Sequence, residues 1–366
     1  MALLSTVLPL SISGQQTADE WLNQGNILYA QARYDEAIQA YEEAIRLDPE
    51  RSEAWVNKGV ALAAQGRNEE AILALDEALR LDPDNLAAWY NKGTILDDQG
   101  KREEATIAFD NALRIKPESV DAWNNKGVAL IAQGRIEEAI QAFEEAIRLN
   151  PEDAEAWNNK GAALAAQGRY EQAIIAYDSA IQLDPEYADA WNNKGAALSA
   201  LGKNDEAILA FDCALRENPE DAVAWYNKGV AHYARGEHDL AIQAYDNAIH
   251  LDPEYGDAWN NKGVVLAAEG KYDQAIQAYD NAIQFDPQKA GAWNNKGAAL
   301  AAQGKFDQAV VAYDEALRRD PGYAEAWYNK GLAFYGLGEY DQAIQCFDEA
   351  ISLDPEIRMK RDLSIR

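Results

Sequence analysis

The stretch that decides the fold is residues 154–187, which read AEAWNNKGAALAAQGRYEQAIIAYDSAIQLDPEY. In its first half, Trp157 and Gly161 recur at the spacing of one helix face, and Ala173, Tyr177 and Ala180 do the same in the second half. The stretch therefore predicts two amphipathic helices joined by a short turn.

Residues at the ends of these helices support the same division. Gly168 falls where a residue with left-handed backbone closes a helix. Glu171 follows at the start of the second helix, where a carboxylate favours the positive end of the helix dipole. Asp184 and Pro185 end the second helix, because proline cannot continue a helix and restricts the residue before it.

Small residues indicate how the two helices pack. Gly161, Ala173 and Ala180 are expected to let the two backbones approach closely, with Trp157 and Tyr177 filling the wider ends of the joint. A larger side chain at Gly161 would overpack this joint at a cost of about 1–3 kcal/mol. One helix pair cannot bury its apolar face alone, so we expect its stability to come from stacking on neighbouring pairs.

The unit recurs ten times between residues 18 and 357 without insertion or deletion. All ten tryptophans, from Trp21 to Trp327, lie 34 residues apart, and a glycine follows each by four places. Such a period marks a repeat architecture. The chain therefore divides into an uncharged arm (1–17), ten repeats (18–357) and a short basic tail (358–366). We number the repeats from 1, which is residues 18–51.

The order Trp, Gly, Leu, Ala, aromatic, Ala, Pro with this period resembles the tetratricopeptide repeat family over almost the whole chain. The resemblance implies an all-α, right-handed superhelical solenoid of ten helix-turn-helix repeats. In such a solenoid the first helix of each pair lines a concave groove and the second forms the convex back. The sequence departs from the family at one place, where lysine (Lys58 through Lys330) occurs nine times instead of a large apolar residue. Family members resemble one another in holding partner peptides and share no single reaction, so the fold alone does not name a function.

An asparagine stands two places after every tryptophan, and the resemblance places it in the groove. One carboxamide offers both a donor and an acceptor, as a peptide bond requires. We therefore predict an asparagine ladder that holds the backbone of an extended partner segment, similar to the substrate-holding repeats of the protein O-linked glycosyltransferases. The alternative is that these residues only cap or solvate the helices. The ladder asparagines are Asn23, Asn57, Asn91, Asn125, Asn159, Asn193, Asn227, Asn261, Asn295 and Asn329.

Three repeats depart from the small, neutral groove residues of the middle of the array. Repeat 3 has Tyr90 with Asp97 and Asp98, either an acidic site for a basic residue or a solvated helix end. Repeat 7 has Tyr226 and Tyr233, and repeat 10 has Tyr328 and Tyr335. The members of each pair are two helical turns apart and share a face. We expect them to anchor a partner, since aromatic residues dominate binding energy at interfaces; ordinary variation within the family is the alternative.

Charge argues against several classes of partner. The net charge is -29, from 62 acidic and 33 basic residues, which disfavours contact with nucleic acid or an anionic membrane. The nine lysines are an open alternative, since a basic stripe would touch a polyanion, but we expect the more numerous carboxylates to pair with them. No run approaches the roughly 18 to 20 apolar residues of a transmembrane helix.

No enzymatic chemistry is indicated. The three histidines lie in repeat 7 without the spacing of a metal site. There is no phosphate-binding glycine loop, nucleophile elbow or zinc-binding helix motif. We predict a protein that is not an enzyme, has no catalytic residue, metal or cofactor, and acts as a protein-interaction scaffold.

A structural role is the alternative function. The last repeat is followed only by the tail and not by a full solvating helix, so a self-associating solenoid that pairs through repeat 10 is the rival hypothesis. Two cysteines, Cys213 and Cys346, form no disulfide framework, which favours the cytoplasm. Export is the alternative, because residues 1–13 faintly resemble a signal peptide without its positively charged start.

Overall fold

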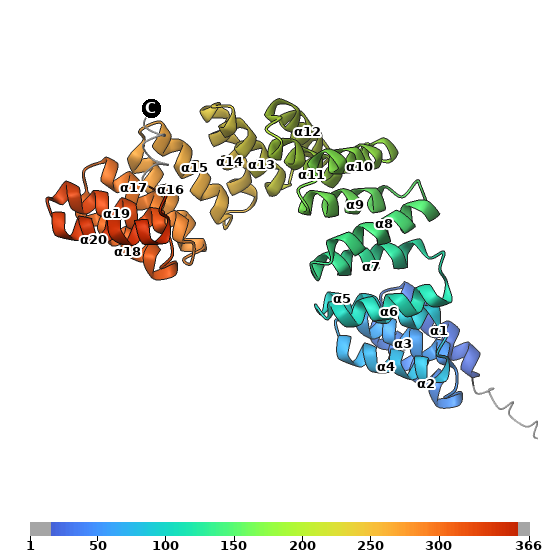
Figure 1. Ribbon diagram of the computed structural model, residues 1–366. Coiled ribbons are helices and arrows are strands. Elements are labelled where there is room, and N and C mark those ends of the chain that lie inside the picture. Colours follow the sequence, from blue (N-terminus) through green and yellow to red (C-terminus); the bar gives the residue numbers. More distant parts are fainter. Residues whose placement is uncertain (1–15, 358–366) are drawn as a thin grey trace, which may run out of the picture. The chain divides into compact units, whose positions relative to one another are not determined.

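The computed structural model of the chain describes residues 16–357, which form twenty α-helices and no strand (Figure 1). The predicted all-helical solenoid of ten helix pairs is confirmed. The arm up to residue 15, with the resemblance to a signal peptide, and the tail from residue 358 lie outside the described residues.

Each repeat contributes a first and a second helix. The first helices are α1 (Ala18–Ala30), α3 (Ser52–Ala64), α5 (Leu86–Asp98), α7 (Val120–Ala132), α9 (Ala154–Ala166), α11 (Ala188–Ala200), α13 (Ala222–Ala234), α15 (Gly256–Ala268), α17 (Ala290–Ala302) and α19 (Ala324–Leu337). The second helices are α2 (Tyr34–Leu47), α4 (Asn68–Leu81), α6 (Arg102–Ile115), α8 (Ile136–Leu149), α10 (Tyr170–Leu183), α12 (Asn204–Glu217), α14 (His238–Leu251), α16 (Tyr272–Phe285), α18 (Phe306–Arg319) and α20 (Tyr340–Leu353).

The helices belong to two compact units, which meet in the sequence between Leu183 and Asp184, so that one unit holds α1 to α10 and the other α11 to α20. Within each unit, a first helix packs against its own second helix, the second helix of the preceding repeat and the first helices on either side. Within each unit, no Cα atom of one second helix comes within 8 Å of a Cα atom of another second helix. The layer of first helices is therefore the tighter one, and each unit curves towards it.

The turn inside each repeat depends on one residue with left-handed backbone. Gly168 has φ +74°, as the sequence predicts, and its N–H donates to the carbonyl of Ala165 at 2.9 Å. The N–H of Arg169 reaches back to the carbonyl of Leu164 at 3.0 Å, so the free carbonyls at the end of α9 find donors. Glycine adopts this conformation without steric cost.

In nine of the ten repeats the glycine four places after the tryptophan packs against an aromatic ring of the second helix, and in repeat 2 Gly59 packs against Leu75. A Cβ at Gly161 would stand 2.5 Å from Cε1 of Tyr177, so the ring lies directly on the glycine. The expectation that two backbones meet there, with the tyrosine at the wider end, is therefore wrong in detail. Tyr177 is 2% exposed, and this burial raises its pKa well above the ordinary tyrosine value.

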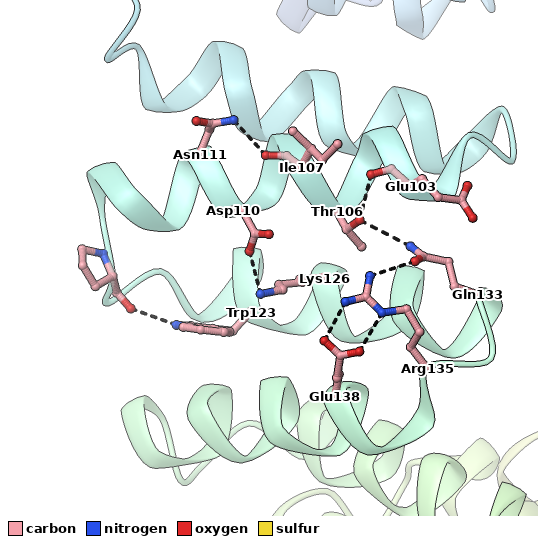
Figure 2. A network of polar contacts seen from close by, with 11 residues as sticks. Glu103, Thr106, Ile107, Asp110, Asn111, Trp123, Lys126, Gln133, Arg135 and Glu138 are labelled. Carbon is pink, nitrogen blue, oxygen red and sulfur yellow. Dashed lines mark hydrogen bonds and ion pairs between the residues drawn. The ribbon is translucent and has the colours of Figure 1, made fainter.

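Tryptophan and lysine join consecutive repeats. From Trp55 onwards, each indole N–H donates to the carbonyl of the proline six residues earlier, at 2.9–3.4 Å. Each of the nine lysines places its ammonium 5.0–5.7 Å from the centroid of the tryptophan ring three residues before it. Figure 2 shows Trp123 of repeat 4 donating to a proline carbonyl, and Lys126 beside Asp110 of the preceding second helix.

The same lysines pair with carboxylates of the preceding repeat. For eight of them the N–O distance to an aspartate or glutamate of the preceding second helix is 2.5–2.9 Å, and the lysine side chains are only 15–22% exposed. These eight are Lys58, Lys92, Lys126, Lys160, Lys228, Lys262, Lys296 and Lys330, which we call the stacking lysines. Because their charge is matched inside the array, they do not form a basic stripe open to a polyanion.

An alanine before each tryptophan lies at the centre of the joint. In repeats 2 to 10 this alanine is 0% exposed, as for Ala258, which packs against Ala248 and Ile249 of the preceding second helix. Repeat 1 has the exposed Glu20 in this place. Its carboxylate accepts from the backbone N–H of Thr17, while the Thr17 hydroxyl accepts from the N–H of Glu20, which is a capping box at the start of α1.

Helix α17 offers a matched pair of glycines for testing this packing. A Cβ at Gly297 would stand 2.6 Å from Cε1 of Tyr313, so we expect Gly297→Ala to lower the free energy of unfolding by about 1–3 kcal/mol. Gly291 has no neighbouring atom within 4 Å, so Gly291→Ala should raise it by up to about 1 kcal/mol through helix propensity. Urea unfolding followed by circular dichroism measures both, and shifts of the same sign would contradict the packing argument.

Candidate partner-binding face

The inner side of each unit carries the predicted site residues. We call the first-helix face the surface formed by four residues of each first helix: the ladder asparagine, the residue four places before it, and the residues three and six places after it. In repeat 10 these are Glu325, Asn329, Leu332 and Tyr335. Consecutive members of this set are three or four residues apart, so they lie along one side of the helix.

Most ladder asparagines form a hydrogen bond to the preceding repeat. Six of them donate a side-chain N–H, at 2.9–3.2 Å, to a side-chain oxygen of the preceding repeat. The acceptor is the residue just before the ladder asparagine there. The pairs are Asn125 to Tyr90, Asn159 to Asn124, Asn227 to Asn192, Asn261 to Tyr226, Asn295 to Asn260, and Asn329 to Asn294. Within each unit the ladder is thus a line of hydrogen bonds that ties first helix to first helix.

Asn57 and Asn91 have other acceptors, because the preceding repeat offers no side-chain oxygen at the usual place. Leu22 and Val56 stand before the ladder asparagines of repeats 1 and 2 and offer no side-chain oxygen. Asn57 accordingly donates to Oδ1 of Asn26 at 3.0 Å. Asn91 turns to the carbonyl of Ala87 in its own helix at 2.8 Å.

A sequence signal for this arrangement exists and was missed. In repeats 3 to 10 the residue before the ladder asparagine is always asparagine or tyrosine, each of which carries a side-chain oxygen. Several of these acceptors are more buried than the ladder itself, with Asn124 at 5% and Asn294 at 2% exposure. Buried polar groups need a hydrogen-bond partner, so the pair of adjacent polar residues points to an internal bond.

The ladder asparagines nevertheless differ in how far their side chains are exposed to solvent. Asn23 is exposed, Asn329 is buried at 4% exposure, and the other eight are half-buried. A carboxamide has two N–H donors and a carbonyl acceptor. A half-buried amide with one N–H bonded to the next repeat, such as Asn295, therefore still offers hydrogen-bonding capacity at the first-helix face.

The first tyrosine of each predicted pair is part of the packing. The Tyr226 hydroxyl accepts from Asn261 at 3.0 Å, and its ring lies 5.0 Å from that of Tyr255 and 5.9 Å from that of Tyr245. Burial raises the pKa of Tyr226, against the opposing effect of the hydrogen bond from Asn261. In the same way the Tyr328 ring packs 5.3 Å from the ring of Phe347.

The second tyrosine of each pair faces solvent. Tyr233 is 37% exposed and Tyr335 is 62% exposed. Each stacks on the ring that begins the next helix, His238 at 5.7 Å and Tyr340 at 5.4 Å. The structure therefore separates the four predicted tyrosines into two that pack against neighbouring rings and two that are exposed to solvent.

The described part of the chain has neither a metal-binding cluster nor a membrane-spanning helix. Between residues 16 and 357, no group of three or more histidine, cysteine, aspartate or glutamate side chains is arranged to hold a metal ion. None of the helices in this range combines the length and the apolar character needed to cross a membrane. His232, which is 7% exposed, has its Nδ1 2.7 Å from a carboxylate oxygen of Glu237.

The internal ladder predicts unequal costs for the same substitution at two sites. Asn329→Ala leaves the buried Oδ1 of Asn294 without its donor, so we expect the free energy of unfolding to fall by about 1–3 kcal/mol. Asn91→Ala removes only a bond within its own helix and should cost less than about 1 kcal/mol. Thermal and urea unfolding of both variants decide the matter, and equal losses would show that the inter-repeat bond contributes nothing.

Comparisons with known proteins agree with this architecture. Models described as "Tetratricopeptide repeat" match residues 22–86, 63–120, 90–149, 125–188, 192–255 and 294–356, and another matches 244–277. A model described as "TPR repeat" matches residues 263–304. The search of curated proteins returned no match.

Solved structures show the same fold. A tetratricopeptide repeat protein from Parabacteroides merdae ATCC 43184 is 20% identical, with a TM-score of 0.56, over 68% of this chain and 98% of that one. The hetero-tetramer Cut9-Hcn1 of the APC/C provides a chain that is 18% identical, with a TM-score of 0.55, over 94% of this chain and 75% of that one. YrrB, described as a TPR protein with an unusual peptide-binding site, is 27% identical over 52% of this chain and 98% of its own, with a TM-score of 0.45.

The family matches together span almost all ten repeats. Proteins with these repeats generally mediate protein–protein interactions, and the fold is typically a non-catalytic scaffold. With its helix pairs, its 34-residue period and these matches, the chain belongs to the tetratricopeptide repeat family.

Proposed function

We propose that this protein is an interaction scaffold that holds an extended segment of a partner protein along the first-helix face. The observation that carries the proposal is the apolar surface left open there. Val128 is 39%, Val223 47% and Leu332 41% exposed, although the helices that carry them bury other apolar side chains. Apolar side chains beside half-buried amides suit a peptide, which has both apolar side chains and a polar backbone.

The asparagine ladder supplies the polar part of this proposal through the donors and acceptors that the inter-repeat bonds leave over. Packed helices lie about 8–10 Å apart, and an extended chain advances about 3.3 Å per residue. One ladder asparagine can therefore meet roughly every third peptide unit. Each net hydrogen bond contributes about 0.5–1.5 kcal/mol, whereas association costs an estimated 4–15 kcal/mol, so binding requires a segment that spans several repeats.

The first test compares the two sides of the array. One variant carries Val128→Lys and Val223→Lys on the first-helix face, and a matched variant carries Ile107→Lys and Val311→Lys, which are 59% and 61% exposed on second helices. Both remove two exposed apolar side chains and add two charges. We expect the first variant to lose, in a pull-down with the wild-type chain as reference, the partners that the second one keeps. Loss only in the second variant would move the binding site to the second helices and refute the proposal.

A second test isolates the ladder from stacking. Asn91 makes its bond within its own helix, so Asn91→Ala removes an amide from the first-helix face without breaking a tie between repeats. For a partner segment identified by the pull-down, we expect the dissociation constant to rise about two- to tenfold, as the loss of one hydrogen bond predicts. An unchanged constant, measured by isothermal titration calorimetry, would assign the asparagines to the internal ladder alone.

Self-association remains the second candidate, because α20 exposes an apolar surface. Ile344 is 57% and Ile351 39% exposed, and with Tyr328, Phe347 and Asp348 they line a hollow of about 340 Å³. In earlier repeats the next first helix packs against the equivalent residues. None of the described residues covers Ile344 and Ile351 as a next first helix would.

The start of the array limits how two copies could meet. The exposed Glu20 of repeat 1 stands where the later repeats bury an alanine. Adding this end to α20 of another copy would bury an unpaired carboxylate, which is costly. We therefore expect any dimer to join two α20 surfaces. Light scattering tests this rival: a monomer mass at all concentrations excludes it, and a dimer that Ile344→Lys dissociates supports it.

A further inference from the structure

Repeat 10 carries a pair of exposed aromatic rings at the turn between its helices. Tyr335 lies in the last turn of α19 and Tyr340 begins α20, with ring centroids 5.4 Å apart and planes at 65°. Their side chains are 62% and 58% exposed. Two adjoining large rings left to solvent are typical of an interaction surface.

The neighbouring repeat fixes the backbone beside this pair. Gly336, next to Tyr335, lies under the ring of Phe306 from repeat 9, because a Cβ there would stand 2.8 Å from Cζ of that ring. Two residues later Gly338 takes φ +81° and ends the helix. The backbone beside Tyr335 is therefore fixed by the neighbouring repeat.

Carboxylates flank the second ring. Glu339 and Asp341 stand on either side of Tyr340 in the sequence, and both are exposed. Among the ion pairs and side-chain hydrogen bonds between described residues, none involves the carboxylate of Glu339 or that of Asp341. In eight of the ten repeats the residue in the place of Glu339 is instead a lysine or an arginine.

The whole of repeat 10 is acidic. Residues 324–357 contain seven acidic residues and one basic residue, Lys330, which is already paired with Asp314 at 2.6 Å. Repeat 9, residues 290–323, contains four acidic and four basic residues. Repeat 10 therefore carries a net negative charge, whereas repeat 9 is neutral.

We propose that Tyr335, Glu339, Tyr340 and Asp341 form a docking site for an arginine or lysine side chain in a basic segment of the partner protein. Aromatic faces attract a cation within about 6 Å of the ring centroid, and a carboxylate beside them accepts its N–H groups. The inference rests on the proposed function, because it names the chemistry of the segment that the scaffold holds.

Repeat 1 has a similar pair that serves as an internal control. The rings of Tyr29 and Tyr34 are also 5.4 Å apart, but Arg33 precedes the second ring and pairs with Glu36. A cation near this pair meets a positive charge that repeat 10 does not present. The spacing of the two rings is therefore shared, while the residue before the second ring changes from an acidic to a basic one.

Repeat 7 is intermediate between these two. Its Tyr233 and His238 are 5.7 Å apart and Glu237 precedes the second ring, as Glu339 does in repeat 10. The Glu237 carboxylate is already bound, to Arg235 at 3.1 Å and to His232 at 2.7 Å. Of the three pairs, the one in repeat 10 thus combines exposed rings with a carboxylate that has no cation among the described residues.

The test uses the full chain and a defined probe. The probe is a fluorescein-labelled peptide of roughly twelve residues, about 40 Å when extended, with arginine at every third place and glycine and serine elsewhere. A second peptide carries glutamine in place of arginine. Fluorescence anisotropy at about 50 mM salt, where the Debye length still allows surface charges to act, gives the dissociation constants.

Three variants of repeat 10 are compared. Two of them install residues found at the same place in other repeats, and the third is a control that makes the same change of charge elsewhere. Tyr335→Ala installs the alanine of repeats 2, 5, 8 and 9, and Glu339→Lys installs the lysine of repeats 3, 6, 8 and 9, so both should fold. Glu349→Lys makes the same change of charge at an exposed place ten residues further along the chain. We expect each of the first two to raise the dissociation constant of the arginine peptide about three- to tenfold, with Glu349→Lys having less effect and the glutamine peptide not binding.

Two results would overturn the docking site. Equal losses in Glu339→Lys and Glu349→Lys would reduce the binding to general attraction by an acidic surface, and an unchanged constant in Tyr335→Ala would remove the rings from it. Tyr335 also belongs to the first-helix face, but both results concern repeat 10 alone, and the pull-down with Val128 and Val223 variants tests the face in repeats 4 and 7. A failure of the docking site can therefore be distinguished from a failure of the proposed function.

The chain's own basic segment is the competing occupant, since Arg358, Lys360 and Arg361 follow repeat 10 directly. Replacing these three with glutamine in the full chain decides between the two. An unchanged or weaker affinity for the arginine peptide supports an external partner. An affinity more than about tenfold tighter would show that this segment fills the site, which would overturn the assignment to a partner.

Discussion

Everything in this array depends on the contact between the second helix of one repeat and the first helix of the next. At its centre is a fully buried alanine such as Ala258, and at its rim Lys262 bridges the ring of Trp259 and the carboxylate of Asp246. An exposed ion pair contributes only about 0–1 kcal/mol. The ammonium of Lys262 also lies 5.4 Å from the centroid of the Trp259 ring, and such a cation–π contact contributes about 0.5–1 kcal/mol.

The demands of this joint determine which side chains remain for function. The tryptophan, alanine, lysine and glycine of each first helix are engaged in stacking, and the ladder asparagine is engaged in part. Leu332 and Tyr335, three and six places after the asparagine of repeat 10, take no part in these contacts. The residues six places after the asparagine also vary from repeat to repeat, from alanine to tyrosine, isoleucine, serine and aspartate. A solenoid of this kind can thus change its ligand without changing its fold.

The parts of the structure that follow from a local period were predictable from the sequence. Helix ends, the left-handed glycine and the number of repeats depend on residues within one unit, and these predictions are confirmed. The direction of the ladder amides was not anticipated, because the acceptor of Asn295 is Asn260, 35 residues earlier, and only the stacked geometry brings them together. For the same reason Tyr226 and Tyr233 were equivalent in the sequence, although the first ring is packed against Tyr255 and the second faces solvent.

Because the repeats are so similar, the few repeats that differ determine where a ligand is held. A peptide held by equal ladder asparagines can shift by one repeat and regain the same hydrogen bonds, so the ladder supplies affinity but no preference for a register. A difference of 1.4 kcal/mol between two registers already makes one of them about tenfold more populated. One repeat with distinct chemistry is therefore enough to fix the position of a ligand on an otherwise repetitive surface. In this chain repeat 10, with its exposed rings and its seven acidic residues, differs in this way from the neutral repeat beside it.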